Sequence, residues 1–483
     1  MEDLLELCGV FSTKKIRYQN LLGTNDDKAD LLFQLIVDGK VSSNEDAMRA
    51  MFEDNSFPEK SLARTKERLR KRLVNSMMCA YDERESLILR TYKNLEKELF
   101  AFKILRAKGK KKAARVLGEK AIKRAIKNEF TDIVLGFARD LHRHYAIDED
   151  NRKKYQYYAN LVKTAARTFN EERIIEGHYI DVIFHLKGKK HYSGKVIELI
   201  REKAEEVNDL METCTTFKAV LLGSNVMVYY YQLTQQIGKL VERCQRTISF
   251  FENLDYVPPY TAFFSFLYKL IPNQILLKQF DEVEQSIQKC LQLATEGSHN
   301  WIITKQYEVV MYFHQGKIRE AGQIIRSMRK DYANEIKNFR ETWLIYEAYA
   351  ALLNGEKVRL GKFLNDVPQF SKDKRGMNIN MLIIQVLVLL QRRKYGDLID
   401  RMAALERYSY RYLKKDDTFR SNCFIHILLK LEKGDFNLIA VRRHAAKYLK
   451  ALQSVPVEKS KQDIDVEVVP YELLWEKVVE ILK

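Results

Sequence analysis

Apolar residues recur along most of the chain at helical spacing, and turn-forming residues interrupt them at regular intervals. In one stretch the apolar positions are Val283, Ile287, Leu291 and Ala294, a spacing of three or four residues that places them on one side of a helix. Turn-like segments separate such stretches, and they read LLKQFDEVEQSI, FHQGKIREAGQII, LLNGEKVRLGKFL, LQRRKYGDLIDRM and KLEKGDFNLIAVRR. Because an apolar helical stretch precedes each turn and an amphipathic one follows it, each unit is predicted to be a helical hairpin.

These predicted hairpins repeat with a nearly constant period. The apolar residues that follow the successive turns are Leu240, Phe280, Ile318, Val358, Tyr395 and Phe436, at spacings of 40, 38, 40, 37 and 41 residues. A single hairpin cannot bury both of its apolar faces, so such units are stable only when they stack on one another. The sequence therefore predicts an all-α fold, a helical-hairpin solenoid preceded by a small helical domain.

Two segments resemble tetratricopeptide repeats. In YFHQGKIREAGQII, Tyr312, Gly316 and Ala321 lie at the spacing of that family's large, small and small packing residues, and LRAKGKKKAARVL is similar at Gly109 and Ala114. The period of about 39 residues exceeds the 34 of the family, and most units lack its closing proline. The resemblance implies a TPR-like α-solenoid whose concave groove binds a protein or peptide.

The pattern divides the chain into four predicted regions. The N-terminal part shows two capping-box patterns, Ser42-x-x-Glu45 and Ser56-x-x-Glu59, and is predicted to be a helix-turn-helix-like module. After the solenoid, SVPVEKSKQDIDVEVVP lacks helical periodicity, and YELLWEKVVEILK is amphipathic again. The predicted boundaries are 1–82 for the helical module, 83–455 for the solenoid, 456–470 for a linker and 471–483 for a C-terminal capping helix.

Composition supports a helical protein of the cytoplasm. The chain contains only 19 Gly and 7 Pro, which are few turn-forming residues for a many-stranded sheet. Its six Cys are scattered singly, as expected in a reducing compartment. The start, MEDLLELCGVF, is acidic where a secretory signal would be basic. The apolar run MLIIQVLVLL is about half as long as a membrane span requires, so we expect no membrane partner.

The positive charge is concentrated near the N-terminus. The formal net charge is +17, and residues 61–128 contain 21 Lys and Arg against 7 Asp and Glu. On a helical wheel, the leucines of the basic helix at 62–75 lie opposite its cations. The predicted contacts to DNA, RNA or an acidic partner are Arg64, Arg68, Lys71 and Arg72, together with Lys110, Lys111, Lys112 and Arg115 from the next basic run. The sequence leaves open whether these cations contact nucleic acid, an acidic protein surface or only solvent.

Polar residues recur at two positions of the predicted first helix of each hairpin. These positions lie fifteen and eleven residues before the aligned residue that follows each turn, on one face of that helix. The predicted ligand-binding residues of the groove are Asn225, Tyr229, Ser265, Lys269, Tyr307, Glu347, Asn380 and Ser421. Small polar side chains in a row can hydrogen-bond the backbone of an extended peptide.

No catalytic signature was found in the sequence, and we expect neither a metal nor a cofactor. GKKHYSGKV departs from the phosphate-loop spacing, and His142 and His144 are two residues apart, so on a helix they point in different directions. The main hypothesis is a non-enzymatic binding protein with a basic N-terminal region that contacts nucleic acid. Its layout resembles peptide-responsive bacterial regulators that carry a small helical domain before a TPR array. The alternatives are a pure protein scaffold whose basic region docks on an acidic protein, and an enzyme with an unrecognised site.

Overall fold

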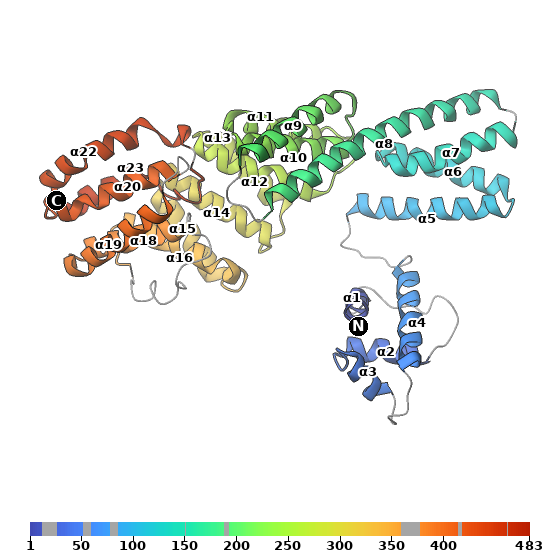
Figure 1. Ribbon diagram of the computed structural model, residues 1–483, viewed down its shortest axis with the longest axis horizontal. Helices are drawn as coiled ribbons and strands as arrows, with labels where there is room; N and C mark the ends of the chain where they lie inside the picture. The colour runs from blue at the N-terminus through green and yellow to red at the C-terminus, as the bar shows by residue number, and fades with distance from the viewer. Residues whose placement is uncertain are drawn as a thin grey trace. The chain divides into compact units, whose positions relative to one another are not determined.

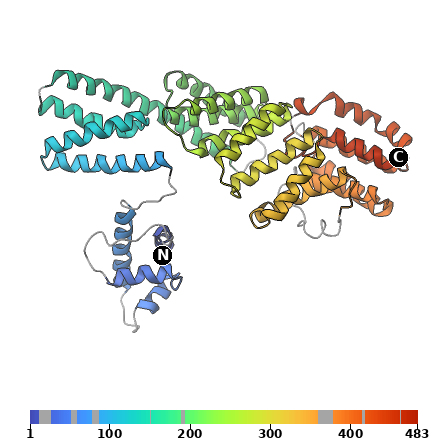
Figure 2. The same cartoon turned by 180° about the vertical axis from the view of Figure 1, so that it is seen from behind.

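The computed structural model describes residues 1–11, 27–51, 59–77, 86–149, 151–187, 193–358, 377–413, 418–460 and 462–483. Within these ranges the chain forms helices and no β-strand, and most consecutive helices pack on each other (Figures 1 and 2). The predicted all-α class is therefore confirmed. The chain divides into two compact units, Met1–Phe169 and Asn170–Lys483, and the long helix α8 (Arg152–Leu186) contributes residues to both.

The N-terminal module of the first unit has its own apolar core. Its helices are α1 (Glu2–Phe11), α2 (Asp27–Val37), α3 (Asn44–Met51) and α4 (Glu59–Met77). The capping box at the start of α3 is formed by Ser43 and Asp46, because Asp46 N donates to Ser43 Oγ and Ser43 N donates to Asp46 Oδ2. The box predicted at Ser42 is thus displaced by one residue, and the second predicted box includes residues 56–58, which lie outside the described ranges.

The rest of the first unit is an array of antiparallel helices. It comprises α5 (Leu87–Ala107), α6 (Lys111–Lys127), α7 (Thr131–Ile147) and the first part of α8. Gly109 lies in the turn between α5 and α6 with φ of 69°, a left-handed conformation that favours glycine. Inside α6, a Cβ on Gly118 would approach Phe102 to 2.8 Å, so glycine permits close packing of these two helices. The buried aromatic rings of Phe102 and Phe137 form the centre of this core.

The second unit continues the succession of hairpins. One large core extends from α10 to α23, and a smaller core lies among α8, α9 and α10. Its helices are the second part of α8, α9 (Gly194–Thr213), α10 (Phe217–Leu233), α11 (Ile237–Glu252), α12 (Tyr260–Leu276), α13 (Phe280–Leu293), α14 (His299–His314), α15 (Ile318–Asp331), η1 (Glu335–Phe339), α16 (Arg340–Leu353), α18 (Met377–Gln391), α19 (Tyr395–Tyr412), α20 (Phe419–Leu428), α21 (Lys430–Lys433), α22 (Leu438–Ser454), η3 (Val457–Lys459) and α23 (Tyr471–Leu482).

A left-handed residue recurs at the turns between the two helices of these hairpins. In these turns, the described residues with positive φ are Gln235, Lys278, Gly316, Gly355, Arg393, Asp435 and Phe436. The recurrence gives a structural basis for the period seen in the sequence, because each such turn ends the helix before it. The second helix begins at the aligned residue in α13, α15 and α19, whereas Leu240 lies three residues inside α11 and Phe436 two residues before α22. The sequence alignment was therefore displaced at those two units.

Residues 456–470, for which the sequence predicts a linker, pack against the helices of the second unit. Ile464, Val466, Val468 and Val469 are buried and belong to the large core. Helix α23 then follows, and its contacts with α18 and α20 place it on the same array. We call residues 456–470 the C-terminal segment.

None of the described helices is both long enough and apolar enough to cross a membrane.

Candidate functional site

The cations of α4 lie on the side opposite its leucines. Leu62, Leu69 and Leu73 are buried in the core of the N-terminal module, and Arg64, Arg68 and Lys71 are exposed. The fourth predicted cation has a different environment: the side chain of Arg72 is only 13% exposed, and its Nη1 lies 3.1 Å from Asp30 Oδ1 of α2. Three exposed cations thus form the basic face of α4.

The second basic run is partly neutralised within its own unit. Lys111 forms an ion pair with Asp148, and Arg115 Nε lies 3.1 Å from Glu149 Oε1. The side chains of Lys110 and Lys112 are exposed at the start of α6. Of the four predicted residues, two therefore have acidic partners from the end of α7 and the residues after it.

Four of the predicted groove residues form one cluster between α10 and α12. Asn225 Oδ1 accepts hydrogen bonds from Ser265 Oγ at 3.1 Å and from Lys269 Nζ at 3.0 Å. Lys269 Nζ also donates to the carbonyl of Ser265 at 2.8 Å, and it lies 5.0 Å from the centre of the Tyr229 ring. Stacking of the hairpins thus brings together polar residues that are about one repeat apart in the sequence.

The predicted residues of the next two hairpins lie apart from this cluster. Tyr307 of α14 is partly buried, and its hydroxyl donates to the carbonyl of Tyr268 at 3.4 Å. Glu347 of α16 forms an ion pair with Arg329 of α15, so its carboxylate is directed to the second helix of the preceding hairpin.

Asn380 and Ser421, the last two predicted residues, are buried beneath the C-terminal segment. Asn380 Nδ2 donates to the carbonyls of Asp465 and Val466 at 3.1 and 3.3 Å. The backbone N–H and the hydroxyl of Ser421 both donate to Gln462 Oε1, at 3.1 and 2.8 Å. Both residues therefore bind the stretch 462–466 of the same chain.

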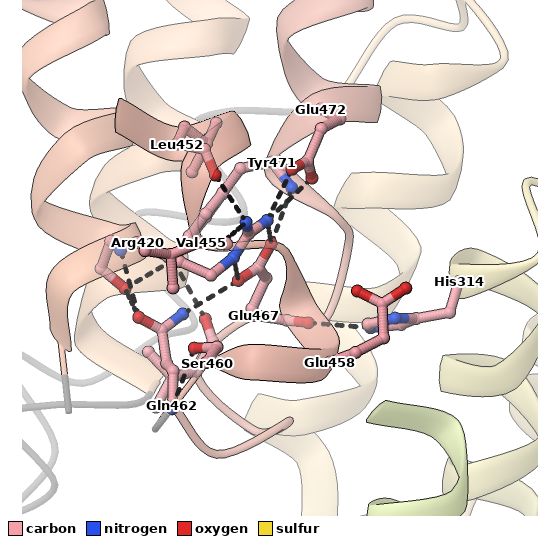
Figure 3. A network of polar contacts seen from close by, with 12 residues as sticks. His314, Arg420, Leu452, Val455, Glu458, Ser460, Gln462, Glu467, Tyr471 and Glu472 are labelled. Carbon is pink, nitrogen blue, oxygen red and sulfur yellow. Dashed lines mark hydrogen bonds and ion pairs between the residues drawn. The ribbon is translucent and has the colours of Figure 1, made fainter. Parts of the chain in front are cut away.

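Arg420 of α20 lies at the centre of this contact and is fully buried (Figure 3). Its Nε and Nη2 donate to the two carboxylate oxygens of Glu467 at 2.8 and 2.7 Å. Nη1 donates to the carbonyls of Leu452 and Val455 at 3.2 and 2.6 Å, and Nη2 donates also to Glu472 Oε2 at 2.8 Å. All five N–H groups of the guanidinium thus have acceptors.

The C-terminal segment is held through its backbone as well. The carbonyl of Glu467 accepts a hydrogen bond from His314 Nε2 at 3.0 Å, and the carboxylate of Glu467 also accepts from Gln462 Nε2 and Tyr471 N (Figure 3). Side chains from three first helices, α14, α18 and α20, therefore contact one short segment. Main-chain carbonyls of this segment thus accept hydrogen bonds from side chains of the array, a type of contact that peptide-binding grooves also use.

Burial affects the two bases in this network differently. Burial acts against the charge of Arg420, but its hydrogen bonds and charge interactions with Glu467 and Glu472 outweigh this and raise the pKa of the guanidinium. For His314, burial lowers the pKa of the imidazole to about 4, and the hydrogen bond to the Glu467 carbonyl opposes the shift only in part. At neutral pH the imidazole is thus uncharged and donates through Nε2–H.

Arg420, Glu467, Gln462 and Tyr471 were not among the residues predicted from sequence. One signal for their segment was present in its apolar pattern, because Ile464, Val466 and Val468 alternate with polar residues and all three are buried in the structure. The contact with Arg420 had no local signal, because the two charged partners are 47 positions apart.

The described residues contain no group of three His, Cys, Asp or Glu side chains arranged to hold a metal ion. Comparisons with family models, with curated proteins and with solved structures returned no match to this chain.

Proposed function

We propose that this protein is a non-enzymatic, TPR-like binding protein that holds an extended segment of a protein partner on the first helices of its hairpins. Its basic N-terminal module then contacts nucleic acid. The observation that supports the first part is the way in which the array holds its own C-terminal segment.

Another polypeptide can accept the same hydrogen bonds. Asn380 and His314 donate to main-chain carbonyls of the segment, and main-chain carbonyls are present in every peptide. In the cluster on α10 and α12, the side chains of Ser265 and Lys269 are partly buried, and the buried amide of Asn225 accepts a hydrogen bond from each of them. We infer that a partner's extended segment binds over this cluster.

Peptide display on the full-length protein tests the groove. Random decapeptides are selected on the immobilised chain, and their affinities are then measured with Ser265→Arg. The long side chain in the cluster is expected to weaken binding at least tenfold, because it fills the space of the peptide. Ser249→Arg is the matched control, since Ser249 is exposed on α11, the second helix of its hairpin.

Thermal unfolding of both variants shows that the fold is kept. Two results contradict a peptide-binding groove at this cluster: that no peptide is selected, or that the selected peptides bind Ser265→Arg as tightly as the unmodified chain.

The basic face of α4 supports the contact with nucleic acid. Arg64, Arg68 and Lys71 are exposed on one side of a helix whose other side is anchored in a core. Cations that neutralise phosphates release condensed counterions, so the affinity for nucleic acid depends steeply on salt.

A salt titration of binding to labelled duplex DNA and single-stranded RNA tests this contact. In the triple variant Arg64→Gln, Arg68→Gln and Lys71→Gln, the slope of log K against log salt is expected to fall by about 2 to 3. The control removes three exposed cations from second helices, with the substitutions Lys239→Gln, Lys330→Gln and Lys447→Gln. Equal slopes for the two variants would exclude the basic face, and binding of acidic proteins only would favour the scaffold alternative.

A further inference from the structure

Lys269 is a partly buried cation that has no carboxylate partner within the described part of the chain. Its Nζ donates to Asn225 Oδ1 and to the carbonyl of Ser265, both of which are neutral acceptors. Among the described residues, no Asp or Glu lies within ion-pair distance of this ammonium. The ring of Tyr229, 5.0 Å away, provides a third favourable contact for the positive charge.

Arg420 is a buried cation of the same array that a polypeptide segment covers. That guanidinium also comes from a first helix, and the C-terminal segment supplies the carboxylate of Glu467 to it. The charge of Arg420 is thereby compensated, whereas the charge of Lys269 is not. The difference between the two sites is the acidic side chain of a bound segment.

Part of the C-terminal segment lies beside α12, the helix that carries Lys269. A small cavity of about 70 Å³ is lined by Asn273 and Leu276 of α12 and by Ser460 and Gln462 of the segment, among others. Asn273 is one helical turn from Lys269 and donates to its carbonyl at 2.6 Å. A second polypeptide over α10 and α12 would therefore lie beside the segment that already occupies the array.

Burial makes an acidic ligand favourable at this place. Desolvation lowers the pKa of Lys269, which means that the surroundings of the ammonium do not fully replace its hydration. A carboxylate that approaches Nζ would compensate for the lost hydration with a charge-assisted hydrogen bond. An amide of the same shape would not, so the site distinguishes Glu from Gln and Asp from Asn.

We propose that Lys269, supported by Asn225, Ser265 and Tyr229, is the subsite that binds an Asp or Glu side chain of the partner's extended segment. This inference rests on the proposed peptide-binding function and names the chemistry that the partner must carry.

The test uses matched peptide pairs on the full-length chain. Each decapeptide selected by display is synthesised with its acidic residues and again with every Glu changed to Gln and every Asp to Asn. The acidic peptide is expected to bind roughly ten- to hundredfold more tightly, the range that one charge-assisted hydrogen bond supports. In Lys269→Gln this preference should disappear, while the amide peptides keep their affinity. Lys330→Gln on α15 is the control and should retain the preference.

A second measurement reports on the amine itself. After reductive ¹³C-methylation, the pKa of the Lys269 amine is followed by NMR with and without each peptide. An acidic peptide should raise this pKa, and the matched amide peptide should leave it unchanged. If Lys269 had only a structural role, neither peptide would change its pKa.

The outcomes separate the two proposals. If peptides bind at the Ser265 cluster without an acidic preference, or if Lys269→Gln keeps that preference, the proposed subsite is contradicted and the proposed groove is not. If no peptide binds there at all, both are overturned.

Discussion

Arg420 keeps its charge in a fully buried position because each of its N–H groups has an acceptor. Taking a guanidinium and a carboxylate out of water costs several kcal/mol per ion, and only close contact with complete hydrogen bonding offsets that cost. The pair with Glu467 fulfils both conditions, since two parallel hydrogen bonds join them and Glu472 adds a second carboxylate. The residue therefore fixes the C-terminal segment on α20.

Removal of this side chain should be strongly destabilising. Arg420→Ala leaves the carboxylate of Glu467 buried without its cation, and we expect the free energy of unfolding of the second unit to fall by about 3–5 kcal/mol. Urea denaturation monitored by circular dichroism measures the change. Arg443→Ala, at an exposed position of α22, should change it by less than about 0.5 kcal/mol.

The double variant Arg420→Met with Glu467→Gln gives a further check of this explanation. It removes both charges, so it should be less destabilised than the sum of the single variants. A loss below about 1 kcal/mol for Arg420→Ala would show that the pair does not hold the segment.

At the scale of elements, the C-terminal segment is the part of the molecule that differs most from a helical hairpin. Its described residues form the short helix η3 and one turn, and neighbouring helices supply hydrogen-bond donors for the carbonyls of Asp465, Val466 and Glu467. His314 of α14 and Asn380 of α18 are two of these donors. The stability of the segment consequently depends on groups that lie far from it in the sequence.

The protonation of His314 should control how firmly this segment is held. Because the folded pKa of about 4 lies below the value of 6.5 for a free histidine, the folded state binds fewer protons between these pH values. The stabilisation is complete above pH 6.5 and is lost as the pH falls toward 4, by up to about 3 kcal/mol.

Hydrogen exchange over residues 462–469, corrected for the intrinsic rate at each pH, measures this effect. Protection should decrease from pH 6.5 to 4 in the unmodified chain. It should decrease less in His314→Gln, which keeps a donor for the Glu467 carbonyl but has no titrating group. The same pH dependence in both proteins would assign the effect to other groups.

At the scale of the whole molecule, the all-α architecture and the hairpin period were predictable, because both arise from local patterns. Helical spacing of apolar residues is visible within about 11 to 18 positions, and each turn recurs after about 39. The split of the leucine and cation faces of α4 was predictable for the same reason. Only Arg72 differs from the other three cations, since its position at the edge of the basic face brings it to Asp30.

The candidate site was predictable only in part. Asn225, Ser265 and Lys269 were selected by their repeat position, and they form one cluster even though Leu240 was misplaced by three residues in the alignment. Glu347 was selected by the same rule, but its carboxylate pairs with Arg329 on a second helix. A repeat position gives the helix face of a residue, and the neighbouring side chains decide its direction.

The sequence by itself determined the helices, their pairing into hairpins and the concentration of positive charge near the N-terminus, since these depend on residues close together in the chain. Only the tertiary structure decided which polar groups meet. Lys269 contacts Asn225 across 44 positions, and Arg420 contacts Glu467 across 47. Such contacts depend on how successive hairpins stack, and stacking is set by the packing of whole helix faces rather than by any local pattern.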